Sequence, residues 1–166
     1  TKKYPHMSTS APTSALPSIK DARVAIVRAQ WNDHITGPLS RSAHDTLIAN
    51  GFKDKDVTML EVPGAIELTF AASQLIESSL FDAVIAIGCV VRGDTPHFDY
   101  VCQSVTQGIT ALNADCDIPV IFGVLTVESE QQALDRIAGG KVGDKGAEAA
   151  EAAIRMIAFR RHVDEL

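Results

Sequence analysis

The clearest structural signal in the chain lies in Ala83-Val-Ile-Ala-Ile-Gly-Cys-Val-Val-Arg-Gly-Asp-Thr-Pro-His-Phe-Asp-Tyr100. It opens with an almost unbroken apolar run, which predicts a strand buried on both faces. The polar turn 92–96 ends this run, and His97 begins a predicted helix. Open α/β sheets bind their ligands at such turns. Gly93 lets the backbone approach a ligand, free N–H groups suit an anion, and His97 can transfer a proton near neutral pH.

Strands and helices alternate along the rest of the chain. Short crossovers between them require a parallel sheet with right-handed connections and helices on both faces. We therefore predict an α/β fold, a three-layer α/β/α sandwich around a four-stranded parallel sheet of the flavodoxin-like type. The predicted strands are 23–29, 57–62, the apolar run from residue 83, and 118–126. The predicted helices are 33–49, capped by Asn32 or Asp33, then 65–78, 97–113, 129–137 and 145–161, with a glycine-rich break at 138–144.

The composition fits one globular domain. The chain has 166 residues, 46% of them hydrophobic and 22% charged, enough for a sizeable core. A formal net charge of −6 argues against nucleic-acid binding, so an anionic substrate must meet local positive groups. The three cysteines form no CxxC motif, which favours a reducing compartment over disulfides or zinc. Because no apolar run could span a membrane and no signal peptide is evident, we expect a cytoplasmic protein.

Residues 1–20 are rich in Pro, Ser and Thr and lack periodicity, which predicts a flexible amino-terminal arm. Met7 is a candidate natural start, with residues 1–6 as a cloning remnant before it. Such an arm could also add a strand to a neighbour's sheet. We expect residues 21–166 to form a single domain without internal repeats.

The ends of the predicted strands carry the candidate functional side chains, because these ends share one edge of a parallel sheet. Trp31 offers an aromatic plane, Glu67 a carboxylate near a helix start, and the turn before His97 an anion site. Together they describe a pocket for a planar, hydroxylated and phosphorylated molecule.

Each of these residues also has a plain structural role open to it. Trp31 could belong to the core, and carboxylates such as Glu67 are common near helix starts because of the dipole. Arg136 could be a surface charge late in a helix, and the residues before His97 suit any turn or cap. For His97 taken alone, a catalytic role and a structural role in capping or packing are about equally well supported by the sequence.

Four segments in fixed order carry a more specific signal. They are Val62-Pro-Gly-Ala-Ile-Glu67, Gly88-Cys-Val-Val-Arg-Gly-Asp-Thr-Pro-His-Phe-Asp-Tyr100, Pro119-Val-Ile-Phe-Gly-Val-Leu-Thr126 and Gly143-Asp-Lys-Gly146. Together they closely resemble the lumazine synthase family, and the resemblance runs from about Arg23 to Ala158. A nucleotide-binding protein is not supported, since no GxGxxG motif follows the first strand and no Walker motif is present.

The resemblance implies an enzyme that makes 6,7-dimethyl-8-ribityllumazine in the penultimate step of riboflavin biosynthesis. In that reaction 5-amino-6-(ribitylamino)uracil condenses with 3,4-dihydroxy-2-butanone 4-phosphate. The amine attacks the ketone, inorganic phosphate leaves, and the second nitrogen closes the ring. No metal and no organic cofactor are implied. Much of the catalysis would be positioning, with one proton shuttle.

The resemblance also implies roles for individual residues. His97 matches the proposed proton-transfer residue, and Trp31 matches an aromatic ring that stacks on the pyrimidine. The other residues that would bind the pyrimidine or the ribityl chain are Ala65, Ile66, Glu67, Cys89, Val90, Val91 and Phe122, the last contributed by a neighbouring subunit. The phosphate would be bound by Asp94, Thr95 and Arg136, and Lys145 matches a lysine near the site.

Two features depart from the family pattern. Trp31 stands where many members have phenylalanine, so a larger ring could strengthen flavin stacking and favour riboflavin binding. The joint 136–145 is one residue longer than in some capsid-forming members. We therefore expect at least a homopentamer with active sites at subunit interfaces, with a 60-subunit icosahedral shell left open. The alternative function is a non-catalytic riboflavin- or lumazine-binding or shell-forming protein on the same fold.

Overall fold

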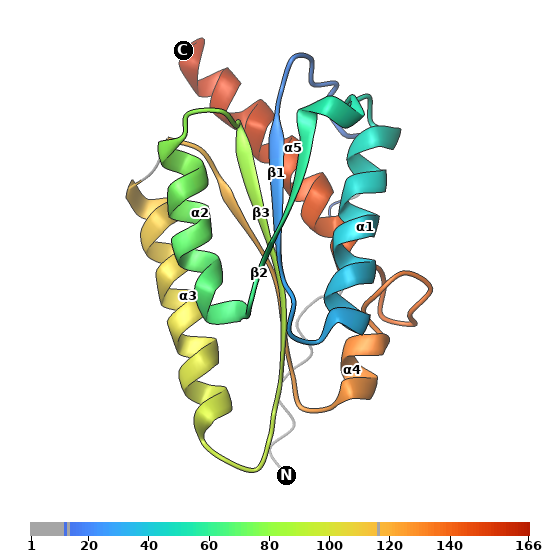
Figure 1. The fold of residues 1–166 in the computed structure, drawn as a ribbon. Helices are drawn as coiled ribbons and strands as arrows, with labels where there is room; N and C mark the ends of the chain where they lie inside the picture. The colour runs from blue at the N-terminus through green and yellow to red at the C-terminus, as the bar shows by residue number, and fades with distance from the viewer. Residues whose placement is uncertain (1–11, 13, 116) are drawn as a thin grey trace.

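The structure, a computed structural model, describes residue 12 and residues 14–115 and 117–166. Most of the expected arm, including Met7, lies outside the described residues. Four parallel strands form one sheet in the order β2-β1-β3-β4 (Figure 1). They are β1 (Val24–Ala29), β2 (Val57–Val62), β3 (Ala83–Val91) and β4 (Val120–Val127).

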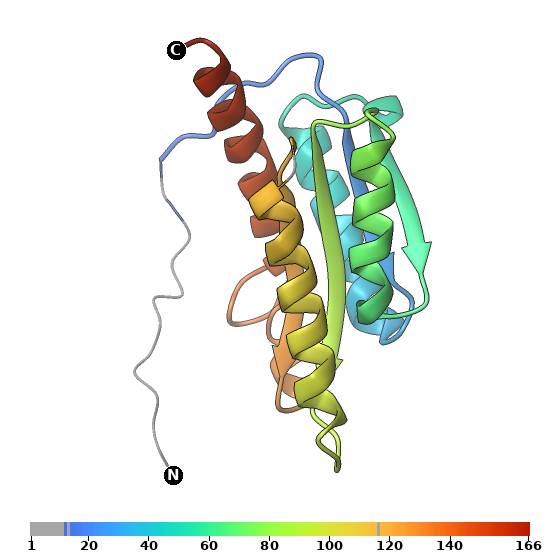
Figure 2. The same cartoon turned by 90° about the vertical axis from the view of Figure 1, so that its left-hand side faces the viewer.

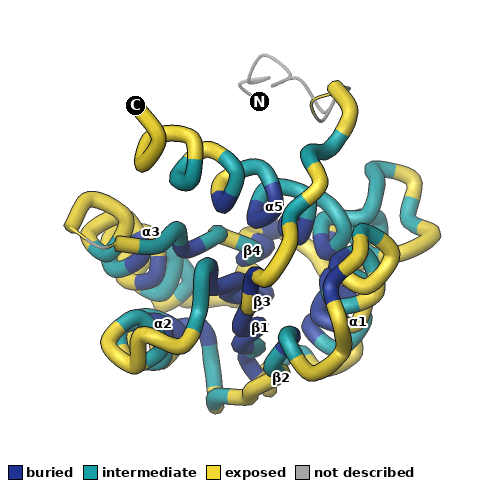
Figure 3. The backbone as a smooth tube through the Cα atoms, turned by 90° about the horizontal axis from the view of Figure 1, so that it is seen from above, coloured by how far each residue is buried: buried dark blue, intermediate teal, exposed yellow. Residues whose placement is uncertain are grey.

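Helices cover both faces of this sheet, and the predicted three-layer sandwich is confirmed. Figures 1 and 3 show α1 and α5 on one face and α2 and α3 on the other, and Figure 2 looks onto the second face. The helices are α1 (Asp33–Ala49), α2 (Leu68–Glu77), α3 (His97–Asp115), α4 (Glu130–Leu134) and α5 (Lys145–Asp164), with 3-10 turns η1 (Asp54–Asp56) and η2 (Ala65–Glu67). Within the described residues, none of these helices is long and apolar enough to cross a membrane.

The central strand β3 divides the core into two clusters. Ile85, Ile87 and Cys89 pack towards α1 and α5, whereas Val84 and Ala86 pack towards α2 and α3. This alternation follows from the two-residue period of a strand. Because helices cover both faces, both sets are buried, which explains why the strand reads as a continuous apolar run.

One predicted helix is shorter than its pattern suggested. The prediction covered 129–137, but α4 ends at Leu134. The next two carbonyl groups bond to the glycine-rich joint: Asp135 O accepts from Val142 N at 2.8 Å, and Arg136 O accepts from Lys145 N at 3.0 Å. These bonds fold the joint back onto the end of α4 and occupy carbonyl groups that a longer helix would use for its own bonds.

The described part of the arm, residue 12 and residues 14–20, contains no helix or strand, and it runs past α5. Arg155 donates to Ser14 O at 2.5 Å, and Arg161 donates to Lys20 O at 2.7 Å. Leu16 is half-buried against the core cluster on this face of the sheet. These contacts connect the segment to the last helix.

The start of α5 approaches α1 so closely that only glycine fits. A Cβ at Gly146 would lie 2.2 Å from the carbonyl oxygen of Leu39. Asp144 caps α5 by accepting from Gly146 N at 3.0 Å, and the Ser42 hydroxyl on α1 donates to the same carboxylate.

We therefore predict that G146A destabilises the protein by about 1–3 kcal/mol, because a methyl group there pushes two packed helices apart. G37A is the matched control, since a Cβ at Gly37 would be 3.8 Å from its nearest neighbour, an ordinary contact. Urea unfolding of both variants measures the difference. Equal stability of G146A and the native protein would contradict the close approach.

A second prediction concerns His44 on α1. Its ring nitrogens lie 3.0 Å from an Asp45 carboxylate oxygen and 2.9 Å from an Asp54 oxygen. These bonds, that to Asp45 first, raise the pKa of His44 above its ordinary value of 6.5. The stabilisation is complete below pH 6.5 and is lost as the pH rises through the higher folded pKa.

H44Q should therefore lower the melting temperature more at about pH 5.5 than at about pH 8.5. D54N should weaken the same pH dependence because it removes one of the two acidic partners. A melting-temperature loss in H44Q that is independent of pH would show that the charge of the imidazole contributes nothing.

Candidate active site

A pocket of about 430 Å³ opens at the edge of the sheet where β1, β2 and β3 end. This edge is at the bottom of Figure 1. The pocket lies between the turn after β1, the turn after β2, the end of β3 and the start of α3. Its lining residues are Trp31, Asn32, Gly64, Ala65, Ile66, Glu67, Cys89, Val90, Val91, Gly93, Thr95, His97, Phe98 and Val101.

The turn after β1 forms the first wall. Trp31 donates its backbone N–H to Pro63 O at 3.0 Å, and its side chain is 75% exposed. Asn32 takes the left-handed conformation, with φ 60°, which asparagine adopts more readily than most residues. It occupies the N-cap position of α1, but its side chain makes no cap bond. Instead Asn32 Nδ2 donates to Cys89 O at 2.9 Å and ties this wall to β3.

The turn after β2 forms the second wall. η2 begins the segment that was predicted as part of a longer helix, and Glu67 N donates to Gly64 O at 3.2 Å. Leu68 is fully buried and anchors the start of α2 in the core. The Glu67 carboxylate is exposed and lies beside Gly64, 3.7 Å from where a Cβ there would stand. It thus offers acceptors for hydroxyl groups at the rim of the pocket.

The end of β3 forms the floor. The Cys89 side chain belongs to the core cluster under α1 and α5, so it is the backbone of Cys89 that faces the pocket side. Burial first, and the nearby Glu130 carboxylate second, raise the pKa of the Cys89 thiol to about 11. The thiol is therefore protonated near neutral pH and takes no part in nucleophilic chemistry.

The turn after β3 has its one positive side chain already engaged. Arg92 Nε donates to Glu128 at 2.6 Å, and its Nη2 donates to Asp99 at 3.3 Å. The guanidinium also lies 4.3 Å from the centre of the Phe98 ring. The bond to Glu128 is the main reason that the pKa of Arg92 is raised. An anion in this turn would meet mainly backbone N–H groups rather than a free cation.

A comparison with known proteins identifies the family. The family model for 6,7-dimethyl-8-ribityllumazine synthase matches residues 21–161. The chain belongs to the 6,7-dimethyl-8-ribityllumazine synthase family. The family expected from the four sequence motifs is therefore confirmed.

Three relatives carry the name of this synthase. The protein of Phocaeicola vulgatus is 53% identical over 152 residues, which cover 92% of this chain and 90% of that protein. The protein of Porphyromonas gingivalis is 55% identical over 147 residues, covering 89% and 91%. That of Bacteroides fragilis is 53% identical over 137 residues, covering 82% and 95%. The prediction of an enzyme of this class is confirmed.

Most of the lumazine synthase residues predicted from the sequence meet in one pocket, but four do not line it. Asp94 lies in the turn after β3 without lining the pocket. Phe122 lies opposite Ala86 near the start of β4 and is 42% exposed. The other two, Arg136 and Lys145, flank the joint between α4 and α5.

Some residues that line the pocket were not predicted to do so from the sequence. Asn32 was considered only as a helix cap, and Phe98 and Val101 were assigned only to the helix that starts at His97. The hydrogen bond from Asn32 to Cys89 joins residues 57 positions apart, so no local sequence pattern predicts it. Phe98 and Val101 follow His97 by one and four residues, and a helical repeat from His97 would have found Val101. Among the described residues, no cluster of three or more His, Cys, Asp or Glu could hold a metal ion.

We predict that iodoacetamide at about pH 8 leaves Cys89 unmodified in the folded protein. At the raised pKa of about 11, only about one thiol in a thousand is ionised at that pH. Peptide mass spectrometry measures the modification, and the same reaction in urea is the control. Modification of Cys89 as fast in the folded protein as in urea would contradict both its burial and its raised pKa.

Proposed function

We propose that this pocket is where 5-amino-6-(ribitylamino)uracil and 3,4-dihydroxy-2-butanone 4-phosphate condense to 6,7-dimethyl-8-ribityllumazine with release of phosphate. One observation carries the proposal: Trp31, Glu67 and His97, from three separate strand ends, line a single cavity. An aromatic plane, a hydroxyl acceptor and a proton-transfer group are what this pair of substrates requires. A binding module would have no need of the histidine.

The pyrimidine would stack on Trp31 and lie along the backbone of Cys89–Val91, with its ribityl hydroxyls donating to Glu67. The phosphate would bind at the N–H groups between Gly93 and the start of α3. Thr95 Oγ1 accepts from His97 N at 3.4 Å, which places its hydroxyl at the same turn. Asp94, an acid, would contribute only its backbone.

His97 would move the protons of the condensation. It lines the pocket at the first turn of α3, and its side chain is exposed. An imidazole there can take a proton from the attacking amine and return it to the departing oxygen. The rest of the rate gain would come from holding amine and ketone in contact.

The phosphate also needs a cation, and Arg136 would supply it from a neighbouring subunit. Arg136 donates to Gln132 O at 2.7 Å, and within the described part of the chain no carboxylate lies within ion-pair distance of its guanidinium. Its carbonyl accepts from Lys145 N, so the two basic residues are adjacent. Lys145 is paired with Glu148 at 2.7 Å. Neither residue lines this chain's own pocket.

The expected assembly fits this division of the site. Trp31 and Phe122 are 75% and 42% exposed, and a neighbouring subunit would cover such apolar surface. We propose a homopentamer in which Phe122, Arg136 and Lys145 of one chain complete the pocket of the next. Residues 21–166 would act as one domain, with residues 1–20 as an arm in the cytoplasmic protein. Whether pentamers assemble into a 60-subunit shell is measurable by light scattering.

An activity assay tests the roles. H97A should lower kcat about a hundredfold, the usual loss for a proton-transfer group, while lumazine formation remains detectable. R136A should mainly raise KM for the phosphate-bearing substrate. H162A, an exposed histidine near the end of α5, is the matched control and should retain native activity. Full activity in H97A and R136A would contradict the roles proposed for His97 and Arg136.

Mixing the two variants tests the shared site. Each is poorly active, but co-assembled subunits would restore pockets with native His97 from one chain and native Arg136 from the next. Random one-to-one mixing in a ring should restore about a quarter of the pockets. Mixtures no more active than their parents would place both residues in one chain's site.

A further inference from the structure

A charged residue near the end of β1 has no obvious place in a buried strand. The neighbours of Arg28 in β1 are buried, and its own side chain is only 18% exposed. Taking a guanidinium out of water is costly unless carboxylates and hydrogen bonds compensate it. The contacts of the Arg28 guanidinium therefore indicate its role.

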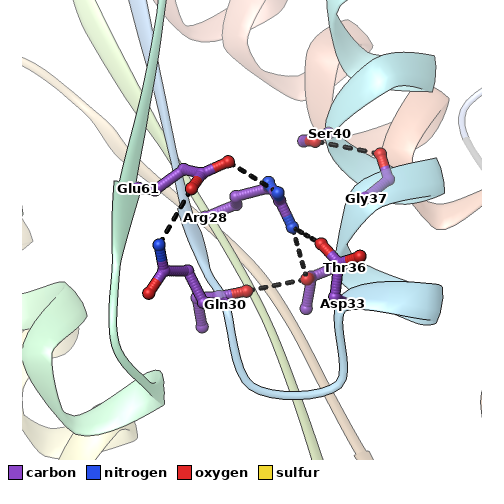
Figure 4. Close-up of polar contacts among 8 residues, drawn as sticks. Arg28, Gln30, Asp33, Thr36, Gly37, Ser40 and Glu61 are labelled. Carbon is purple, nitrogen blue, oxygen red and sulfur yellow. Dashed lines mark hydrogen bonds and ion pairs between the residues drawn. The ribbon is translucent and has the colours of Figure 1, made fainter.

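The guanidinium reaches two carboxylates from different elements (Figure 4). Nη1 donates to the Asp33 carboxylate and, at 3.3 Å, to Thr36 Oγ1; Nη2 donates to Glu61 at 2.6 Å. Gln30 Nε2 donates to the second oxygen of Glu61 at 2.9 Å. Burial alone would lower the pKa of Arg28, but the bonds to Asp33 and Glu61 together raise it. Arg28 is thus a permanent charge between two acids.

The two acids adjoin the two walls of the pocket without lining it. Asp33 directly follows Trp31 and Asn32, which form the first wall. Glu61 stands two residues before Pro63, and the second wall follows from Gly64. Arg28 therefore joins the wall that presents the aromatic ring to the wall that presents Glu67.

The first wall needs such support. Within the single chain the Trp31 side chain is mostly exposed, so contacts of its own chain do not fix the ring, and Asn32 holds a left-handed backbone. The backbone of this turn is held by bonds from Gln30 N to Val62 O, from Trp31 N to Pro63 O and from Thr36 Oγ1 to Ala29 O, the last at 2.7 Å. Thr36, fully buried, also accepts from Arg28, so one network reaches both ends of the turn.

We propose that Arg28 is a positioning residue for pyrimidine binding: its fork holds Asp33 and Glu61 at a fixed separation and so sets the plane of Trp31 relative to Glu67. The proposal rests on the proposed function, which places the pyrimidine on Trp31. Lysine would not replace Arg28, since one ammonium group lacks the planar fork that bonds two separate carboxylates at once.

The test uses the full-length assembled protein and the variants R28M, R28K and E61Q. E61Q is nearly isosteric and removes one of the two negative partners. R23M is the matched control, because Arg23 directly precedes β1 at the opposite end of the strand, where its side chain lies over the Phe81 ring. Thermal melting first establishes which variants are folded.

The first readout is fluorescence of Trp31, the one tryptophan of the chain. Time-resolved anisotropy without substrate should gain a fast component in R28M and R28K but not in R23M, because the indole is released with its turn. The second readout separates KM from kcat. KM for the pyrimidine substrate should rise about tenfold in R28M, and KM for the butanone phosphate should change less than about twofold.

A purely structural Arg28 would lower the melting temperature without moving the anisotropy or the KM ratio, and that result overturns the proposal. If R28M does not fold, R28K and E61Q carry the same test. The anisotropy arm needs no substrate, so it decides the role of Arg28 even if the protein forms no lumazine. Conversely, altered anisotropy with an unchanged pyrimidine KM would contradict the placement of the pyrimidine on Trp31.

Discussion

The whole structure depends on the burial of β3. This strand is hydrogen-bonded to β1 on one side and β4 on the other, and helices cover both of its faces. The backbone N–H and C=O groups of such a strand are engaged within the sheet, so they can bind a ligand only where the strand leaves the sheet. It leaves after Val91, at the edge where β1 and β2 also end. Three strand-to-helix turns therefore meet at one place, and the pocket between them is a consequence of the parallel topology.

Charge is distributed around this pocket in a consistent way. Each of the two arginines near it, Arg28 and Arg92, is held by two carboxylates from different elements. Both hold turns together, and neither is left free for an anion. Within the described residues, Arg136 donates to the backbone carbonyl of Gln132 and makes no ion pair, and it lies outside the pocket. If the phosphate binds to backbone N–H groups of one subunit and to an arginine of the next, catalysis requires the assembled oligomer.

Much of the fold could be predicted from the sequence, because strands buried on both faces read as apolar runs and helices as amphipathic repeats. The pocket edge followed from the same pattern and brought Trp31, Glu67 and His97 together. The end of α4 could not be predicted, since it is set by bonds from the joint to Asp135 and Arg136. Nor could the Arg28 network or the bond from Asn32 to Cys89, which join residues distant in sequence. The one indication in the sequence was Arg28 itself, because a charged residue in an apolar strand requires partners from elsewhere in the fold.

The most direct test of the account is a crystal structure of the assembled protein with 6,7-dimethyl-8-ribityllumazine and phosphate. We expect the ring of the lumazine against Trp31, ribityl hydroxyls at Glu67, and phosphate at the turn from Gly93 to Thr95, with Arg136 of an adjacent subunit beside it. Product bound in any other cavity, or a pocket closed by residues of its own chain alone, would contradict the account.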